Sequence, residues 1–296
     1  MTKHEFMNVS LSYKLANESY LITGCARSGT SIFGSILGSM QNTEYSYEPP
    51  MILALFSQIN KIKKKEWMFL FESYLLEEFY VNSLAGRTIN TNKNDDSSIY
   101  NFKDNEEINK RIIKSHSRLD IIKKISFDKV VFKNPDILLN CIKILNYYPK
   151  LKLLITKRDN FEIIESLFRK KWFDQNNLNK GVIWPFKIYK NSKIPYFIDD
   201  SEFDFWLSLN QINKAAFYVS KIIEIQKRLP NNRITYLDYN KLLDNKFDYV
   251  SNISKKLNMK MTEKTLKILK SIKKRKHNYK LNQKTILREL LVKING

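Results

Sequence analysis

A loop near the amino end of the chain has the glycine spacing of a phosphate-binding loop but lacks its lysine. Gly24 and Gly29 are separated by four residues, and Arg27 is the only cation between them. Thr30 and Ser31 occupy the positions where such a loop carries lysine and then serine or threonine. The missing lysine argues against ordinary hydrolysis of a nucleoside triphosphate. Backbone amides at a helix start, together with a guanidinium, still suit a phosphate or a sulfate. A structural turn beside a surface arginine is the alternative.

A second arginine with a nearby hydroxyl follows a later apolar run. Arg158 lies near the end of the β-prone run 151–159, and Ser166 comes eight residues later, within a helical pattern over 160–172. Ligands of open α/β sheets bind at the carboxyl ends of the strands, and an arginine with a hydroxyl can hold a second phosphate there. The same residues are also compatible with an exposed arginine before an ordinary helix.

The elements that must position these residues alternate between strand and helix patterns. Short apolar, β-prone runs predict strands, and apolar residues at helical spacing predict helices. Such alternation indicates an α/β fold, a central parallel β-sheet of about five strands flanked by helices on both faces. The predicted strands are 19–24, 43–50, 128–135, 151–159 and 233–239, and the predicted helices are 30–42, two within 51–84, 136–148 and 160–172.

The rest of the chain fits a single domain over 1–296. The polar, turn-rich segment 85–110 predicts a surface insertion. The aromatic-rich segment 172–232 could cover a site as a helical cap, although its aromatic residues favour packing in a core. The segment 255–296 is predicted to be helical and is very basic.

Composition points to a globular protein of one large domain or two small ones. The chain has 296 residues, 43% of them hydrophobic and 13% aromatic. The two cysteines are far apart, which favours a reducing compartment over a disulfide framework. No signal-peptide pattern opens the chain, and no run reaches the roughly 18 apolar residues of a membrane span. We therefore expect a cytoplasmic protein; its oligomeric state is not readable from the sequence.

The net charge of +21 predicts attraction to polyanions. A coding bias toward Lys, Asn and Ile would produce the same charge without any partner. Contact with an acidic membrane surface is compatible with this charge, whereas no helix-turn-helix, zinc-finger or RNP-like signature predicts nucleic-acid binding. A non-catalytic polyanion-binding protein, which would bind with steep salt dependence and no turnover, is one alternative to an enzyme.

Taken in order along the chain, five short motifs resemble those of sulfotransferases that use 3′-phosphoadenosine 5′-phosphosulfate (PAPS). The loop "ARSGTS" resembles the 5′-phosphosulfate loop of that family, and "RDNFEIIES" resembles its 3′-phosphate segment. "YEPP" (47–50) and "FKNP" (132–135) are similar to segments of the carbohydrate- and tyrosylprotein-modifying branches. "YLDYNKLL" (236–243) resembles a Tyr-Glu-Asp-Leu strand end late in the family's fold.

The resemblance covers roughly residues 19–243 and has two departures. Asn160 replaces the usual Pro or Gly after Arg-Asp, and a glycine-bearing loop that closes over the 3′-phosphate is not evident. The basic segment 270–280 is a candidate for that role, and a solvated basic helix is the alternative.

The resemblance implies a role for each matching residue. PAPS would be the donor and adenosine 3′,5′-bisphosphate the product, with no metal ion. Arg27 or Lys133 would neutralise charge on the leaving oxygen, while Arg158 and Ser166 would hold the 3′-phosphate. The residues implied to hold the 5′-phosphosulfate are Arg27, Ser28, Gly29, Thr30 and Ser31. A P-loop kinase or ATPase is the competing enzyme class, and it would depend on magnesium.

Two residues compete for the role of general base. Glu48 lies in "YEPP", where the family has a Glu beside the acceptor hydroxyl, so it implies a hydroxyl on a carbohydrate or glycolipid. His116 lies in "RIIKSHSRL", which resembles a segment of small-molecule sulfotransferases, and histidine suits base catalysis near neutral pH. Lys133 lies 25 residues before Arg158 and His116 lies 42 before it, and the family's spacing fits Lys133 better. The sequence therefore favours Glu48 and keeps His116 as the alternative.

Overall fold

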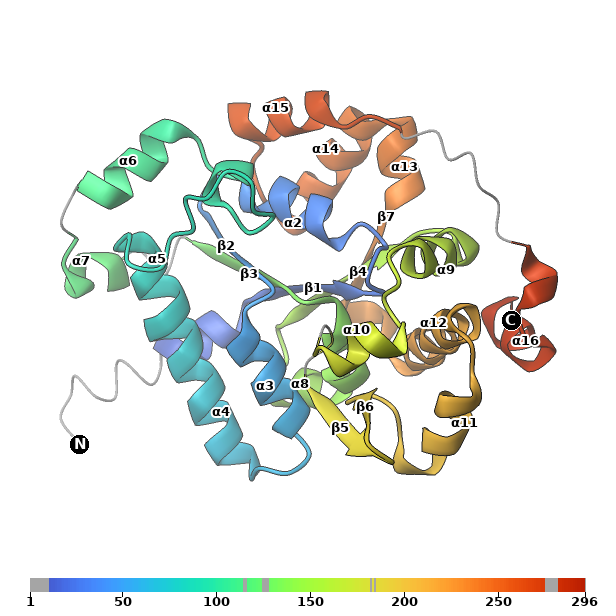
Figure 1. The fold of residues 1–296 in the computed structure, drawn as a ribbon. Helices are drawn as coiled ribbons and strands as arrows, with labels where there is room; N and C mark the ends of the chain where they lie inside the picture. The colour runs from blue at the N-terminus through green and yellow to red at the C-terminus, as the bar shows by residue number, and fades with distance from the viewer. Residues whose placement is uncertain are drawn as a thin grey trace.

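A five-stranded parallel sheet forms the centre of the protein (Figure 1). The computed structural model describes residues 11–113, 116–123, 128–181, 183, 185–274 and 282–295. The strand order is β2-β3-β1-β4-β7, and every neighbouring pair is parallel, which confirms the predicted fold class. The strands are β1 (Tyr20–Gly24), β2 (Thr43–Tyr47), β3 (Lys129–Lys133), β4 (Lys152–Lys157) and β7 (Ile234–Asp238).

Successive side chains of these strands point alternately into two separate hydrophobic cores, one on each face of the sheet. Leu21 and Leu153 point to one side of the sheet, and Ile22 and Leu154 point to the other. On the first side lie α3 (Pro50–Gln58), α4 (Lys64–Ser73), α8 (Cys141–Tyr147), α9 (Asn160–Arg169) and α12 (Gln211–Arg228). On the second lie α2 (Thr30–Gly38), α14 (Lys246–Leu257) and α15 (Glu263–Ser271).

The long helical stretch predicted over 51–84 forms two helical segments, the second of them continuous through three elements. After α4 the chain enters a π-helix, η1 (Tyr74–Val81), and ends in α5 (Asn82–Leu84). The π-helix directs Tyr80 to donate a hydrogen bond of 2.6 Å to Asp128, just before β3. It thereby ties this helical segment to the start of the central strands.

The segment 85–110 is only partly the surface insertion that its polar composition predicts. It contains η2 (Ile99–Asn101) and the start of α6 (Asn105–Ile113), and it buries Ser98, Phe102 and Lys103. Phe102 packs edge-on against Tyr45 of β2, with ring centroids 5.0 Å apart. Its few apolar residues, widely spaced in the sequence, come together only in the folded chain.

The aromatic-rich segment 172–232 packs into the first core. Trp206 is fully buried and contacts Phe173 edge-on at 5.4 Å, while Tyr218 of α12 contacts Phe173 and Phe197. Helix α12 also lies against α9 and against α16 (Arg288–Asn295). The rest of the segment forms α10 (Gln175–Asn179), the antiparallel hairpin β5 (Phe186–Tyr189) and β6 (Ser192–Pro195), η4 (Asp200–Glu202) and α11 (Phe203–Ser208).

The remaining short elements connect these layers. Among the described helices, none is long and apolar enough to cross a membrane. The short elements are α7 (Arg118–Ile122), η3 (Pro135–Asn140), η5 (Asn231–Arg233), α13 (Tyr239–Asp244) and η6 (Gln283–Thr285).

Candidate active site

The loop between β1 and α2 presents a helix start that no side chain caps. Gly29, the residue before α2, has a left-handed backbone with a φ of 99°, and the first turn of α2 carries no acidic residue. Arg27 also has a positive φ, 70°, which is uncommon outside glycine and is concentrated at functional sites. The first amides of a helix lack partners within it, and the helix dipole adds positive potential. This end of α2 therefore fits an anion.

Internal hydrogen bonds hold the loop in this shape. The Ser28 hydroxyl lies 2.6 Å from the Cys25 carbonyl and 2.5 Å from the Thr156 hydroxyl, and the Ser28 amide also donates to Cys25. The Ala26 amide donates to the Tyr218 hydroxyl at 2.8 Å. Ser28 is fully buried, so it shapes the loop from within instead of offering its hydroxyl to a ligand. Nothing in the sequence around Tyr218 signals its contact with the loop.

Arg27, Arg158 and Ser166 form one cluster, although 139 residues separate the first from the last. Arg27 donates from Nε to the Ser166 hydroxyl at 3.2 Å. Arg158 donates from Nη1 to the backbone carbonyl of Arg27 at 3.2 Å and pairs with Glu162 at 2.8 Å. The parallel pairing of β1 with β4 brings their carboxyl ends together and so juxtaposes the two predicted anion-binding segments.

Tyr239 covers this cluster and was not singled out by the sequence. A Cβ atom on Gly29 would lie only 2.6 Å from the Tyr239 ring, so the close approach of the ring requires glycine at this position. The Arg158 guanidinium lies 5.1 Å from the centroid of the same ring, within the range of a cation–π interaction. The available signal was the position of Tyr239 at the carboxyl end of the predicted strand 233–239.

Lys133 connects the loop to Glu48, the residue that follows the neighbouring strand β2. Its Nζ donates to the Ser31 hydroxyl at 3.1 Å, pairs with the Glu48 carboxylate, and lies 3.9 Å from the centroid of the Tyr47 ring. The Lys133 side chain is 1% exposed, whereas that of Glu48 is 41% exposed. Burial raises the pKa of the Tyr47 phenol to about 12, so this phenol stays protonated at neutral pH. Glu48 is therefore the member of this group that an incoming molecule can reach.

The backbone at Glu48 is strained. Glu48 has a φ of 43°, and its amide donates to the Lys133 carbonyl at 2.8 Å. A left-handed backbone is unfavourable for a residue with a side chain, and such strain persists only where the surroundings enforce it. The strained residue pairs with Lys133, and Pro49 directly after it caps the start of α3.

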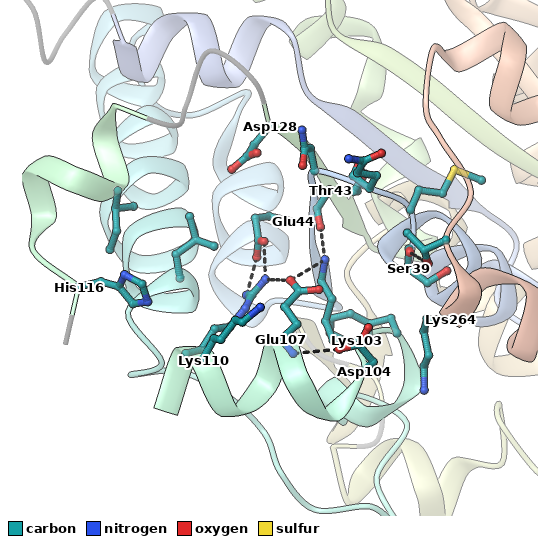
Figure 2. Close-up of a pocket in the computed structure, with 18 residues that line it drawn as sticks. Ser39, Thr43, Glu44, Lys103, Asp104, Glu107, Lys110, His116, Asp128 and Lys264 are labelled. Carbon is teal, nitrogen blue, oxygen red and sulfur yellow. Dashed lines mark hydrogen bonds and ion pairs between the residues drawn. The ribbon is translucent and has the colours of Figure 1, made fainter. Parts of the chain in front are cut away.

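His116 lies near the amino ends of the strands, at the end of the sheet opposite to the loop between β1 and α2. There it lines a cavity of about 730 Å³ (Figure 2). Other residues that line this cavity are Thr43 and Asp128, at the amino ends of β2 and β3, whereas Glu48 and Lys133 follow or form the carboxyl ends of these strands. A strand of five residues spans about 16 Å. The structure therefore does not bring His116 to the loop, which argues against it as the base.

A network of buried ion pairs fills the wall of this cavity. Arg111 binds Glu44 in a bidentate manner, at 2.9 and 2.7 Å, and also pairs with Glu107. Lys103 donates to the Thr43 carbonyl at 2.7 Å and lies 3.2 Å from Glu107. Burial alone would raise the pKa of Glu44, but Arg111 and then Lys103 outweigh burial and lower it. These charges satisfy one another and fasten α6 to β2.

The chemistry of the donor set fits an anion better than a metal ion. Within the residues that the structure describes, no cluster of three or more His, Cys, Asp or Glu side chains could hold a metal ion. The loop edge instead offers guanidinium, ammonium and hydroxyl groups, which suit phosphate and sulfate. Of the basic segment 270–280, residues 275–280 lie outside the described residues, and α15 ends at Ser271.

Comparison with known proteins identifies the family. A sequence profile described as "Sulfotransferase family" matches residues 20–263. Because this match spans most of the chain, the chain belongs to the sulfotransferase family. The prediction of a sulfotransferase enzyme is therefore confirmed, in preference to a P-loop kinase or a non-catalytic polyanion-binding protein. No curated protein matches the chain.

Several solved structures are similar to this chain at low identity. The sulfotransferase domain of the Synechococcus PCC 7002 olefin synthase is 12% identical, with 94% of this chain and 86% of that chain covered and a TM-score of 0.46. Sulfotransferase STF9 from Mycobacterium avium is 14% identical, with 90% and 71% covered and a TM-score of 0.43. The sulfotransferase domain from the curacin biosynthetic pathway is 15% identical, with 84% and 77% covered and a TM-score of 0.44.

Proposed function

We propose that the enzyme transfers a sulfuryl group from PAPS to a hydroxyl group of a carbohydrate or glycolipid. One observation carries the proposal. The cluster of Arg27, Arg158 and Ser166 lies at the carboxyl ends of the strands, as does the Lys133–Glu48 pair. Lys133 also contacts Ser31, which belongs to the anion-binding loop. Lys133 thus contacts both the anion-binding loop and the exposed carboxylate of Glu48.

The arginine–serine cluster supports PAPS over a simple adenylate as the donor. In this proposal Arg158 and Ser166 hold the 3′-phosphate, while Arg27 and the amides from Gly29 to Ser31 hold the 5′-phosphosulfate. The Thr30 hydroxyl would add a hydrogen bond to the same group. When bound, PAPS would supply the sulfuryl group and its own leaving group. The chain's residues would bind and orient the donor and provide the charge that stabilises the transition state.

Glu48 and Lys133 divide the remaining chemistry between them. The Glu48 carboxylate takes the proton of the acceptor hydroxyl as a general base. Lys133 faces both Glu48 and Ser31. Once Glu48 is protonated, the Lys133 ammonium loses its anionic partner, and its positive charge acts on the loop. Proton uptake at Glu48 would therefore increase the positive charge available where negative charge develops.

The acceptor proposal depends on the surroundings of Glu48. The Tyr-Glu-Pro motif resembles that of carbohydrate sulfotransferases. Met51, three residues after Glu48 in the first turn of α3, is 52% exposed and would offer an apolar contact to an acceptor. A sugar ring presents both hydroxyl groups and an apolar face, which suits this pair. We also propose action in the cytoplasm, because the chain has only two cysteines and they lie far apart in the sequence, which favours a reducing compartment over a disulfide framework.

Ligand-dependent thermal unfolding tests the donor. Adenosine 3′,5′-bisphosphate should raise the melting temperature more than AMP or ATP does, because only the bisphosphate would fill both anion sites. Equal stabilisation by AMP or ATP would contradict the assignment of Arg158 and Ser166 to a 3′-phosphate. Sulfuryl transfer should continue in the presence of EDTA, and a loss of transfer that magnesium restores would contradict the proposed chemistry.

Screening with sulfur-labelled PAPS tests the acceptor. Polysaccharides, glycolipids, tyrosine peptides and small phenols would each be incubated with the enzyme and the labelled donor. We expect the label on a carbohydrate hydroxyl. Label on a phenol or a tyrosine alone would overturn the carbohydrate proposal while leaving the donor assignment intact.

A further inference from the structure

The segment 241–274 carries a disproportionate share of the positive charge. It contains ten lysines and three acidic residues, which together give a third of the chain's net charge of +21. The segment spans α13, α14 and α15, which lie side by side on the outer side of α2 (Figure 1). Lys246 ties the start of α14 to the end of α15 by donating to the Ile272 carbonyl at 2.9 Å.

Helices α14 and α15, which contact each other, both expose lysines. On α15 the exposed positions 263, 266, 267 and 270 recur at helical spacing, while Ile268 and Leu269 are buried toward α2. The end of α14 and the loop after it expose further lysines. We call the exposed set the lysine face; it consists of Lys255, Lys256, Lys260, Lys267, Lys270 and Lys273.

Few carboxylates neutralise this surface. Among the ion pairs of the described residues, the segment 241–274 takes part in one, between Lys274 and Asp244 at 3.3 Å. The lysines of the lysine face take part in none of them. Their combined potential therefore extends into solvent, where it attracts a surface of opposite charge.

We propose that the lysine face docks on an anionic lipid surface. Clustered lysines on amphipathic helices gain affinity from acidic headgroups. Phe247 of α14 and Leu266 of α15 are 40% and 39% exposed within the same segment and would enter the boundary between headgroups and acyl chains.

Nucleic acid and acidic glycans suit this surface less well. Each of the ten basic residues in the segment 241–274 is a lysine, and an arginine, Arg275, comes only directly after it. Arginine is the residue whose planar fork best binds discrete phosphate or sulfate groups. A lysine ammonium is instead a point charge that responds to the average charge of a surface. The proposal does not depend on sulfuryl transfer, although a glycolipid acceptor would lie in such a membrane.

Vesicle sedimentation at about 0.1 M salt tests the docking. The full chain should bind vesicles of phosphatidylcholine with 30% phosphatidylserine and not vesicles of phosphatidylcholine alone. A variant that combines Lys255→Gln, Lys256→Gln, Lys267→Gln and Lys270→Gln should bind at least 100-fold more weakly, since each lysine near such a surface contributes roughly fivefold. The matched control changes four exposed lysines elsewhere to Gln and has the same net charge; they are Lys61, Lys63, Lys65 and Lys143.

Each outcome decides for or against the docking site. The control should keep near-normal binding, and Leu266→Ser should weaken binding to vesicles but not to heparin. Equal losses in the two quadruple variants would show that net charge alone drives binding and would overturn the proposal. So would tight binding to polyuridylate or heparin without binding to the anionic vesicles. Because no donor is present, a failure here is distinguishable from a failure of sulfuryl transfer.

Discussion

Glu44 and Glu48 stand near opposite ends of β2, and each pairs with a cation, but their surroundings differ. Glu44 and its partner Arg111 are 6% and 5% exposed, and the pair is bidentate. Glu48 is 41% exposed, its partner Lys133 is 1% exposed, and that lysine also contacts the anion loop through Ser31. The first pair is closed to solvent on both sides, whereas the second leaves its carboxylate open.

This is the difference that we expect between an ion pair with a structural role and one that takes part in the proposed chemistry. A buried pair whose hydrogen bonds are all made fixes geometry, and loss of one partner leaves an uncompensated charge. A pair with one exposed member can exchange its partner for a substrate proton. Among the non-glycine residues in this part of the chain, positive φ values fall on Arg27, Asn42 and Glu48. Asparagine adopts this conformation readily, so the unfavourable cases are Arg27 and Glu48, and Glu44 is not among them. Strain thus accompanies the exposed pair.

Substitution of Glu48 should give the largest effect on the reaction. Glu48→Gln should lower the rate of transfer about 10²–10⁴-fold, because the amide cannot accept the acceptor proton. The affinity for adenosine 3′,5′-bisphosphate should barely change, whereas Arg27→Ala should weaken both binding and turnover. Transfer assays and calorimetry measure the two quantities.

His116→Ala is the control for this prediction. It should leave the rate nearly unchanged, since His116 lies at the far edge of the sheet. An inactive but folded His116→Ala enzyme together with an active Glu48→Gln enzyme would assign the base to His116.

Arg111→Ala should give the largest effect on stability. Loss of the guanidinium leaves the buried Glu44 without its partner, and the free energy of unfolding should fall by about 3–5 kcal/mol. Urea unfolding at neutral pH measures this change. A loss below about 1 kcal/mol would be as small as that of an ordinary surface ion pair. It would contradict the structural role of the Glu44–Arg111 pair.

Arg158→Ala should weaken binding of the bisphosphate by roughly 10–100-fold, the usual range for a hydrogen bond to a charged group. Binding of AMP, which lacks the 3′-phosphate, should change much less. Calorimetric titration of both nucleotides provides the comparison, and equal losses for the two would argue that Arg158 acts only through the loop carbonyl that it contacts.

Acid should unfold the protein partly through Glu44. Its folded-state pKa is lowered from the ordinary value of 4.5, so the ionised form favours the fold. The contribution of Glu44 is therefore complete above the unfolded-state pKa and is lost as pH falls through the lower folded-state pKa. Urea unfolding between neutral pH and about pH 3 should show a shallower loss of stability in Glu44→Gln than in the unchanged protein. An identical slope would contradict this assignment.

Tyr239→Leu should give the smallest effect. Removal of the ring that faces the Arg158 guanidinium should weaken bisphosphate binding roughly two- to fivefold, the size of an exposed cation–π contact. Leucine keeps most of the apolar contact over Gly29. A loss as large as that in Arg158→Ala would indicate that Tyr239 contacts the nucleotide itself.

Much of the anion-binding loop and its surroundings was predictable from local sequence. A buried β-prone run, a left-handed glycine and an uncapped helix form within about twenty consecutive residues, so the loop at Gly24–Gly29 is encoded locally. Its relation to Arg158 was also accessible, because parallel strands place their carboxyl ends at one edge. The family resemblance assigned Glu48 and Lys133, but not the contact between them.

The tertiary structure decided what local patterns could not. The sequence by itself determined the alternation of strands and helices, the loop and the order of the motifs, since these depend on periodicity and backbone preferences over short distances. Only the folded chain decided that Ser28 turns inward, that Tyr239 covers Gly29, that His116 lies at the far edge, and that Arg111 buries its charge against Glu44. Each of these outcomes depends on which residues distant in sequence become neighbours, and strand order and packing set those neighbours. Glu44, on β2, and Glu48, directly after it, therefore have different surroundings, which the periodicity of the strand does not distinguish.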